Sequence, residues 1–358
     1  MKKIKTTILT IGALGVFAAP IGIIVASKSG DNSGGVSIVG QGSSSVKPII
    51  NSILKNTYYN TEYQVNGSGQ GFQSQMSSPS LSAFGMTSSL KHPAKPEESE
   101  KWISNKNRTV TFAIDAIGIV LNLPDGISYA SDVRPIINIE ELAKIYDVDD
   151  ADNLTTNTTW GELLDNKSEA TTTSPSALAQ TVIGFGRSGG KEASGTADGF
   201  WHTLKHHMGL LEPDLNHESL PKKNQTDEAN AQAMNVLKEN DGSVTYISLG
   251  YALNNENSNA IVATINPGAS PNWEPTIENV KENKYGWMRP FNIIYSTNNT
   301  QAVTFANFLF TPEVQKLISD NNFVPLTTQQ IKDQIPLDQT DKERNADLIA
   351  GTNMGIKI

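Results

Sequence analysis

The sequence predicts an α/β fold in a chain long enough for two domains, with a ligand site at the carboxyl ends of its strands. Its 358 residues are enough for two hydrophobic cores. Short apolar runs typical of strands are each followed by glycine and hydroxyl residues and then by a helical pattern, before residue 90 and again at 184–200. Ligands of α/β folds bind outside the carboxyl ends of the strands, so these junctions are expected to form the ligand site.

Residues 1–27 are predicted to be a signal peptide or a membrane anchor helix. Three lysines precede Ile8 to Ala26, an uncharged and mostly apolar run whose length lies between that of a cleaved signal and that of a spanning helix. The chain has no cysteine that could carry a lipid, so we favour the uncleaved anchor. Both alternatives place the body of the protein on the outer face of the cytoplasmic membrane, either anchored or secreted. Residues 28–35 are expected to be a flexible linker.

The composition excludes several classes of function. A net charge of -9 makes nucleic acid a poor partner. Without cysteine there can be no disulfide, thiolate metal site or cysteine nucleophile. His202 and His206 are spaced to share one helix face, but no third ligand accompanies them, so a solvated face is expected rather than a metal site. We expect no metal and no cofactor, and a monomer.

The first junction follows a predicted strand at 36–40. Ser43, Ser44 and Ser45 stand before Pro48, which is tolerated in the first turn of a helix. One hydroxyl is enough to cap a helix, and three are more than that task requires. The junction therefore predicts an anion site at a helix N-terminus, with a plain cap as the alternative.

The pattern recurs twice before residue 90. A strand-like alternation at 58–65 is followed by Gly67, Ser68 and a helical run. A short apolar run at 81–84, expected to be a strand, leads to hydroxyl residues that include Ser88. Both junctions offer further hydroxyls at the carboxyl end of a strand.

The stretch 184–200, GFGRSGGKEASGTADGF, supplies Arg187, Lys191, Ser194 and Thr196 among six glycines. A glycine loop before a helix start is a ready anion site, and a mobile surface loop is the alternative. The spacing does not fit a nucleotide phosphate loop. It does fit the GxSxG elbow of serine hydrolases with Ser188 as nucleophile, although the glycines that follow disfavour the helix which that motif requires.

The remaining patterns complete the alternation. Residues 109–123 form a β-branched run that predicts either two strands or one extended strand crossing between domains. Strands are also expected at 242–251 and 287–295. Helices are expected at 139–146, 199–211, 229–239, 301–310 and 312–321.

Taken together, the junctions resemble the phosphate-binding proteins of bacterial ABC importers, which have a type II periplasmic-binding-protein fold. The resemblance runs with gaps from about Val36 to Leu326. It is carried by the following segments: Gly40–Ser45 with Pro48, Gly67–Gly71, Phe84–Ser88, Ser194–Thr196, Asp241–Tyr251, Arg289–Pro290 and the tail at 305–326.

The resemblance implies specific roles for these residues. Ser44, Ser45 and Ser68 would donate to the anion from one domain, and Ser194, Gly195 and Thr196 from the other. Arg187 would be the charged clamp, with Lys191 as its alternative. Ser88 stands where the family usually has an aspartate that accepts the proton of hydrogen phosphate.

The resulting hypothesis is an exported binding protein and not an enzyme. Residues 36–113 and 280–358 would form domain one, and residues 114–279 domain two. Inorganic phosphate would bind between them, and a membrane ABC permease would recognise the closed form. The alternatives are a binder of another oxyanion, which Ser88 favours, a GxSxG hydrolase, and a surface adhesin that reuses the fold.

Overall fold

The fold is described by a computed structural model. It covers residues 37–57, 60–77, 80–89, 93, 95–147, 157–188, 193–207, 225–226, 229–268 and 271–334. The predicted targeting segment at 1–27 and the linker at 28–35 lie outside these residues. No helix within the described ranges combines the length and the apolar character needed to cross a membrane.

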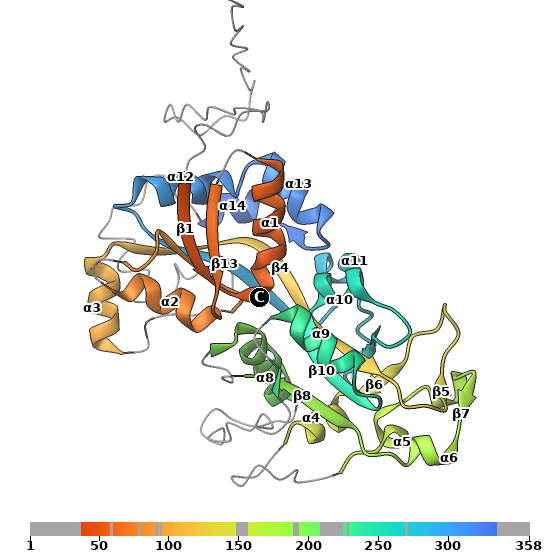
Figure 1. The fold of residues 1–358 in the computed structure, drawn as a ribbon. Coiled ribbons are helices and arrows are strands. Elements are labelled where there is room, and N and C mark those ends of the chain that lie inside the picture. The colour runs from red at the N-terminus through yellow and green to blue at the C-terminus, as the bar shows by residue number, and fades with distance from the viewer. Residues whose placement is uncertain are drawn as a thin grey trace, which may run out of the picture.

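A mixed ten-stranded sheet runs through two lobes in the order β2-β1-β3-β13-β4-β10-β8-β9, and β11 and β14 also pair with β4 (Figure 1). The parallel pairs are β1 with β2, β1 with β3, β10 with β8, and β8 with β9. The strands are β1 (Ser37–Gly42), β2 (Asn60–Val65), β3 (Phe84–Thr87), β4 (Asn107–Asn122), β8 (Ile183–Arg187), β9 (Gln225–Thr226), β10 (Ser243–Ser248), β11 (Ile261–Val262), β13 (Met288–Ser296) and β14 (Val324–Pro325).

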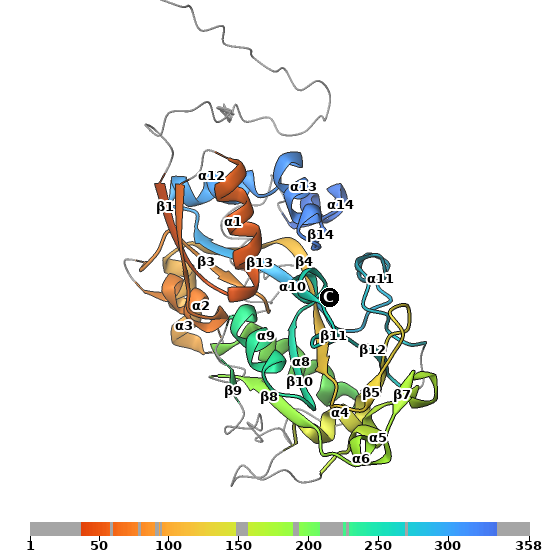
Figure 2. The same ribbon diagram turned by 45° about the vertical axis from the view of Figure 1, so that its right-hand side comes forward.

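Helices surround the sheet in both lobes, which Figure 2 shows from a second side. The upper lobe contains α1 (Lys47–Asn56), α2 (Ser68–Met76), α3 (Pro96–Ser104), α12 (Thr300–Phe308), α13 (Pro312–Asp320), α14 (Thr328–Gln334) and the 3-10 turn η1 (Ser44–Val46). The other lobe contains the helices α4 (Ile139–Ile145), α5 (Trp160–Leu163), α6 (Pro175–Leu178), α8 (Gly195–His207), α9 (Asn230–Lys238), α10 (Leu249–Asn255) and α11 (Ile277–Lys281) and the 3-10 turn η2 (Lys167–Glu169). It also contains two small ribbons, β5 (Ile127–Ser128) with β7 (Thr172–Thr173) and β6 (Ile136–Asn138) with β12 (Thr264–Asn266).

Strand β4 joins the two lobes. It is one strand of 16 residues, so the second alternative for the β-branched run at 109–123 is the one observed. Its first part pairs with β13 from Asn107 to Ala116, and its second part pairs with β10 from Ile117 to Asn122. The strand is buried along nearly its whole length, which explains why the run is mostly apolar and does not alternate between polar and apolar residues.

Each lobe has its own hydrophobic core. One core is built from residues between Ile38 and Ala113 together with residues between Phe291 and Phe323. The other is built mainly from residues between Ala116 and Trp287. The fold is therefore the expected two-domain α/β arrangement, and the discontinuous first domain follows from the return of the chain through β13. The domain boundaries at 113 and 280 stay predictions.

Two elements differ from the sequence-based expectation. The strand expected at 81–84 lies further along the chain in the structure, since β3 begins at Phe84 and the side chain of Leu81 is 74% exposed. The strand expected at 242–251 is too long, because β10 ends at Ser248 and α10 begins at Leu249. Leu249 packs on Gly118 of β4, and this tertiary contact accompanies a helix that begins directly after the β-branched and aromatic residues of β10.

Helix α2 lies against β3 with backbone touching backbone. A Cβ placed on Gly85 would fall well inside van der Waals contact of the Gly71 carbonyl oxygen. A Cβ placed on Gly71 would in turn crowd the Met86 carbonyl oxygen. Both atoms belong to the backbone, which cannot swing away as a long side chain could. This close approach sets the position of Ser68 at the start of α2.

We therefore expect Gly85→Ala to destabilise the protein by about 1–3 kcal/mol, the usual cost of overpacking a filled core. Urea denaturation followed by tryptophan fluorescence measures the effect. Val39→Ala on neighbouring β1 is the control, because that side chain is 38% exposed and its truncation should change the free energy of unfolding by less than about 0.5 kcal/mol. Equal stability of Gly85→Ala and the parent protein would contradict the packing described here.

Candidate functional site

Three strand-to-helix junctions of the first domain bring their hydroxyls together. Ser43 Oγ donates to Ser88 Oγ at 2.9 Å. Ser68 Oγ accepts from the Ser88 backbone N–H at 3.0 Å and lies 3.3 Å from Ser88 Oγ. These side chains are all buried. The carboxyl ends of β1 and β3 and the start of α2 thus form one polar surface, as the sequence predicted.

The second domain meets this surface with the start of α8. Thr196 Oγ1 lies 3.2 Å from Ser45 Oγ, which joins the two domains directly. Gly195 faces Ser68 and Ser88 so closely that a Cβ on it would lie under 3.0 Å from both hydroxyl oxygens. Ser194 accepts from the Ala197 backbone N–H at 3.1 Å and so caps the helix. We call Ser43, Ser45, Ser68, Ser88 and Thr196 the hydroxyl cluster.

A buried arginine that the sequence analysis did not assign to the site binds this cluster. The guanidinium of Arg289, on β13, donates to Ser45 Oγ at 2.9 Å and to Thr196 Oγ1 at 2.8 Å. Its Nε and Nη2 also donate to Asp115 Oδ2 on β4, at 3.0 and 2.7 Å. Arg289 therefore contacts a hydroxyl from each domain while it is held by a carboxylate at the crossing strand.

Asp115 is fixed by a second contact as well. Its Oδ1 accepts from Ser248 Oγ at 3.0 Å. Burial raises the pKa of the Asp115 carboxyl above its ordinary value, and the Arg289 guanidinium and the Ser248 hydroxyl oppose that shift. The ion pair is 1–2% exposed on both side chains, so its charges largely cancel within the protein rather than in water.

Two further predicted ligand residues, Arg187 and Ser44, lie within the described part of the chain. Arg187, the predicted clamp, ends β8 with a fully buried side chain and donates from Nη2 to Asn230 Oδ1 at 2.7 Å. Ser44 lies between two cluster residues and faces a neighbouring cavity. Lys191 lies outside the described residues. The ligand roles of the predicted residues stay predictions, although the structure brings Ser45, Ser68, Ser88, Gly195 and Thr196 into one place.

Ser188, the nucleophile of the hydrolase hypothesis, lies just after β8. Its backbone N–H donates to the Thr226 carbonyl oxygen at 2.8 Å. A nucleophile elbow turns into its helix directly after the serine. Residues 189–192, which would begin that helix, lie outside the described part of the chain, so the hydrolase hypothesis is not tested by this geometry.

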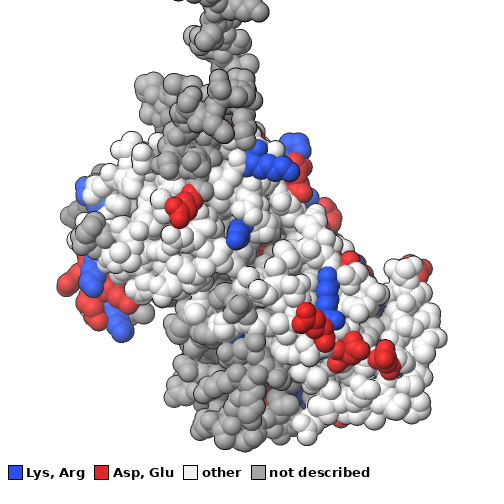
Figure 3. All heavy atoms as spheres, in the orientation of Figure 1, with Lys and Arg blue, Asp and Glu red and all other residues white. Residues whose placement is uncertain are grey.

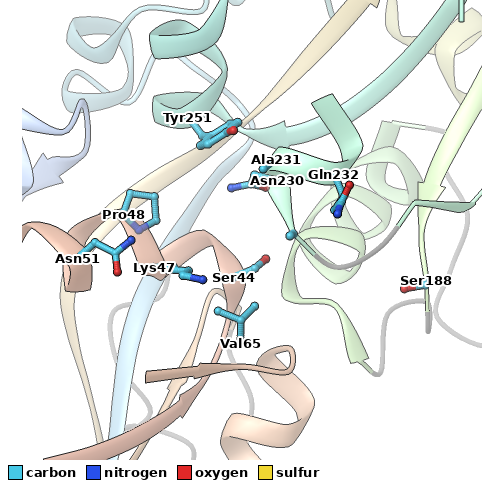
Figure 4. Close-up of a pocket in the computed structure, with 11 residues that line it drawn as sticks. Ser44, Lys47, Pro48, Asn51, Val65, Ser188, Asn230, Ala231, Gln232 and Tyr251 are labelled. Carbon is cyan, nitrogen blue, oxygen red and sulfur yellow. The ribbon is translucent and has the colours of Figure 1, made fainter. Parts of the chain in front are cut away.

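A cavity of about 630 Å³ opens beside the cluster, between the first turn of α1 and the first turn of α9 (Figure 4). Lys47 and Asn51 come from α1 on one side, and Asn230 and Gln232 from α9 on the other. Tyr251 of α10 lies at one end. Burial raises the pKa of its phenol, and the nearby Arg187 charge opposes that shift.

This arrangement suits a small oxyanion. It offers hydroxyls, a guanidinium and the N-termini of α2 and α8, whose first N–H groups have no intrahelical acceptor. No group of three metal-binding side chains occurs among the described residues. The face in Figure 3 carries scattered charges of both signs rather than one large basic patch. Anion binding would therefore depend on local donors.

The signal for Arg289 was present in the sequence. Its run, WMRPFNIIY, is otherwise strand-like, and so is the run TFAIDAIGIVL that contains Asp115. A single charged residue inside each of two apolar strands, with opposite signs, predicts a buried ion pair. Nothing local indicates that the two strands are neighbours, since the residues are 174 positions apart.

A family profile and several solved structures match this chain. The profile described as the PBP superfamily domain matches residues 27–313. A phosphate-binding protein from Stenotrophomonas maltophilia superposes with a TM-score of 0.57 at 14% identity, over 90% of this chain and 100% of that one. A candidate phosphate ABC transporter substrate-binding protein from Clostridium perfringens, solved with bound phosphate, gives 0.56 at 20% identity, over 82% and 100%. At these identities the structural matches establish the fold.

Among curated proteins, an uncharacterized lipoprotein of Mycoplasma genitalium, MG412, is 27% identical over 308 residues. The alignment covers 75% of this chain and 76% of that protein. Its name indicates a lipid anchor, whereas the present sequence has no cysteine.

We expect Gly195→Ala to separate the domains at the cluster. The added Cβ would overlap Ser68 Oγ and Ser88 Oγ, and both serines are fully buried. Losing the Ser45–Thr196 contact should speed amide hydrogen exchange in residues 43–46 by about fivefold or more, as for a hydrogen bond of about 1 kcal/mol. Exchange followed by mass spectrometry measures this.

Gly199→Ala is the matched control on the same helix. A Cβ there meets the flexible end of Ile117 at 3.1 Å and lies 3.9 Å from Arg289 Cδ. The rate of amide hydrogen exchange in residues 43–46 of Gly199→Ala should equal that of the parent protein. Unchanged exchange in Gly195→Ala would show that the contact between Gly195 and the serines does not hold the domains together.

Proposed function

Because the chain belongs to the PBP superfamily, we propose that it is an extracytoplasmic substrate-binding protein that captures inorganic phosphate between its domains and delivers it to an ABC permease. The observation that carries this proposal is the hydroxyl cluster, to which both domains contribute and to which Arg289 donates hydrogen bonds. The phosphate named for the Stenotrophomonas and Clostridium proteins supports the choice of ligand.

In this proposal phosphate enters among hydroxyls that now bond to one another. Ser45, Ser68 and Thr196 would donate to its oxygens, and Arg289 would add a charged donor. Each hydroxyl–hydroxyl bond would be replaced by a bond to an ionised acceptor, which is roughly twice as strong. The N-termini of α2 and α8 would contribute backbone N–H groups from opposite sides.

Closure would couple binding to recognition. β4 and β13 connect the two domains, so a small rotation about these strands opens or closes the cleft. An anion that bonds to Ser45 of one domain and Thr196 of the other favours the closed form. A permease that contacts both domains could then distinguish the loaded protein from the empty one.

Membrane attachment and the absence of catalysis are part of the same proposal. The apolar run from Ile8 to Ala26 would hold the protein at the outer face of the membrane as a monomer. The lipoprotein relative supports an anchored state, and the peptide anchor would replace the lipid that a chain without cysteine cannot carry. Nothing in the cluster needs to break a bond, since the proposed task is binding.

A second oxyanion remains an alternative because Ser88 places a neutral hydroxyl in the cluster. A carboxylate there would repel a fully ionised anion such as sulfate but could accept the proton of hydrogen phosphate. A hydroxyl makes no such distinction by charge. Calorimetric titration of the full chain in detergent with phosphate and then with sulfate decides between them, and no heat from either would overturn the proposal.

We expect Thr196→Val to weaken phosphate binding by about 10–150-fold. The valine keeps the volume of the side chain but removes a donor to a charged ligand, which contributes about 1.5–3 kcal/mol. Calorimetry in phosphate-free buffer gives the dissociation constant. Thr203→Val, two turns further along α8, is the control and should bind as the parent does. Equal binding by Thr196→Val would remove Thr196 from the site.

We expect Ser88→Asp to raise the preference for phosphate over sulfate by at least about tenfold. The carboxylate can accept from the Ser43 and Ser68 hydroxyls that already contact position 88. Its negative charge would repel the fully ionised sulfate, whereas it could accept the proton of hydrogen phosphate. The ratio of the two dissociation constants is the measurement. Ser104→Asp, an exposed position on α3, adds the same charge away from the cleft and should leave the ratio unchanged. A ratio unchanged in Ser88→Asp would place the anion elsewhere.

A further inference from the structure

The cavity beside the hydroxyl cluster is larger than an inorganic oxyanion requires. Its volume of about 630 Å³ lies within the range of about 300–1,000 Å³ typical of sites for small organic molecules. It remains open although the two domains already touch at Ser45 and Thr196. The cavity therefore does not exist merely because the two domains are separated.

The cavity and the cluster share one segment of backbone. Ser44 lines the cavity, while Ser43 and Ser45 on either side of it belong to the cluster. A molecule with one group among the cluster hydroxyls could thus extend past Ser44 into the cavity. Figure 4 shows Ser44 between α1 and α9, with Val65 below it.

The walls of the cavity suit a ligand that carries hydrogen-bond acceptors on a short carbon skeleton. Lys47 supplies an ammonium group, and Asn51 and Gln232 supply amides. Pro48 and Tyr251 supply apolar surface. Of the described residues that line the cavity, none is acidic. The lining therefore favours neutral or anionic acceptor groups and would not attract a cation.

Asn230 is the observation that points to a ligand. It is 4% exposed and begins α9. Its Oδ1 accepts from Arg187 Nη2 at 2.7 Å, which fixes the orientation of the amide. Its Nδ2 has no hydrogen-bond acceptor among the described residues. In Figure 4 this nitrogen points into the cavity, toward Pro48 and Tyr251. A buried donor without an acceptor is costly, and an acceptor on a bound molecule would satisfy it.

We propose that the ligand is a phosphate monoester with a small polar organic group. Its phosphoryl group would occupy the hydroxyl cluster, and its organic group would occupy the cavity, with an acceptor on Asn230 Nδ2 and another near Lys47. This inference rests on the proposed oxyanion function of the cluster. It changes the substrate class from a bare anion to an organic phosphate.

Calorimetry on the full chain in detergent tests this, with inorganic phosphate and glycerol 3-phosphate as the probes. We expect glycerol 3-phosphate to bind at least about tenfold more tightly than inorganic phosphate, because it adds hydrogen bonds in the cavity. Lys47→Gln should weaken the ester by about tenfold and inorganic phosphate by less than about twofold. Lys55→Gln, at the far end of α1 and outside the cavity, should change neither.

The possible outcomes separate this inference from the function on which it rests. Binding of inorganic phosphate without binding of the ester overturns the inference and leaves the proposed function standing. Binding of the ester alone supports the inference and shows that inorganic phosphate is not the ligand. Binding of neither overturns both. Tight ester binding that Lys47→Gln and the cavity-filling variant Ala231→Leu leave unchanged would show that the organic group lies elsewhere.

Discussion

The buried ion pair between Asp115 and Arg289 is the interaction on which the site depends. It joins β4 to β13, the two strands that connect the domains, at the level of the cleft. Removing one partner of such a pair leaves an uncompensated buried charge, at a cost of about 3–5 kcal/mol. The same guanidinium still has donors for Ser45 and Thr196. The fold therefore places a cation at the interface, orients it with a carboxylate, and directs its remaining donors to hydroxyls of both domains.

This arrangement bears on how an acidic protein would bind the proposed anion. The chain has a net charge of -9, and the charge of Arg289 is largely compensated by Asp115. The affinity must then come from hydroxyls, helix N-termini and backbone N–H groups, which act over short distances. Such donors discriminate by geometry and by the number of acceptors on the ligand. They discriminate less by net charge, so the uncharged Ser88 matters for the proposed choice between phosphate and other oxyanions.

Much of the fold and part of the site could be predicted from the sequence. The alternation of strand, glycine or serine, and helix predicts the α/β class, and the resemblance carried by the junctions predicts that Ser45, Ser68, Ser88 and Thr196 share one site, where the structure brings them together. Asp115 and Arg289 were not paired, because they are 174 residues apart and only the register of β4 against β13 brings them together. The start of α10 was missed for a similar reason, since its helix is stabilised by packing on β4 against a strand-like local pattern. Local signals identify residue types, and tertiary pairing decides which of them meet.

The two polar regions of the cleft differ in what a ligand would gain there. In the hydroxyl cluster the hydroxyls already hydrogen-bond to one another, so a phosphoryl group would replace existing bonds to neutral acceptors with bonds to a charged one. In the cavity, Asn230 Nδ2 has no acceptor among the described residues, so a ligand atom placed there gains the full value of a new hydrogen bond. A ligand shifts the closure equilibrium only by the contacts that differ between the open and closed forms. Because Asn230 and Lys47 belong to opposite domains, a molecule that bridges them would favour closure in the same direction as one that bridges Ser45 and Thr196.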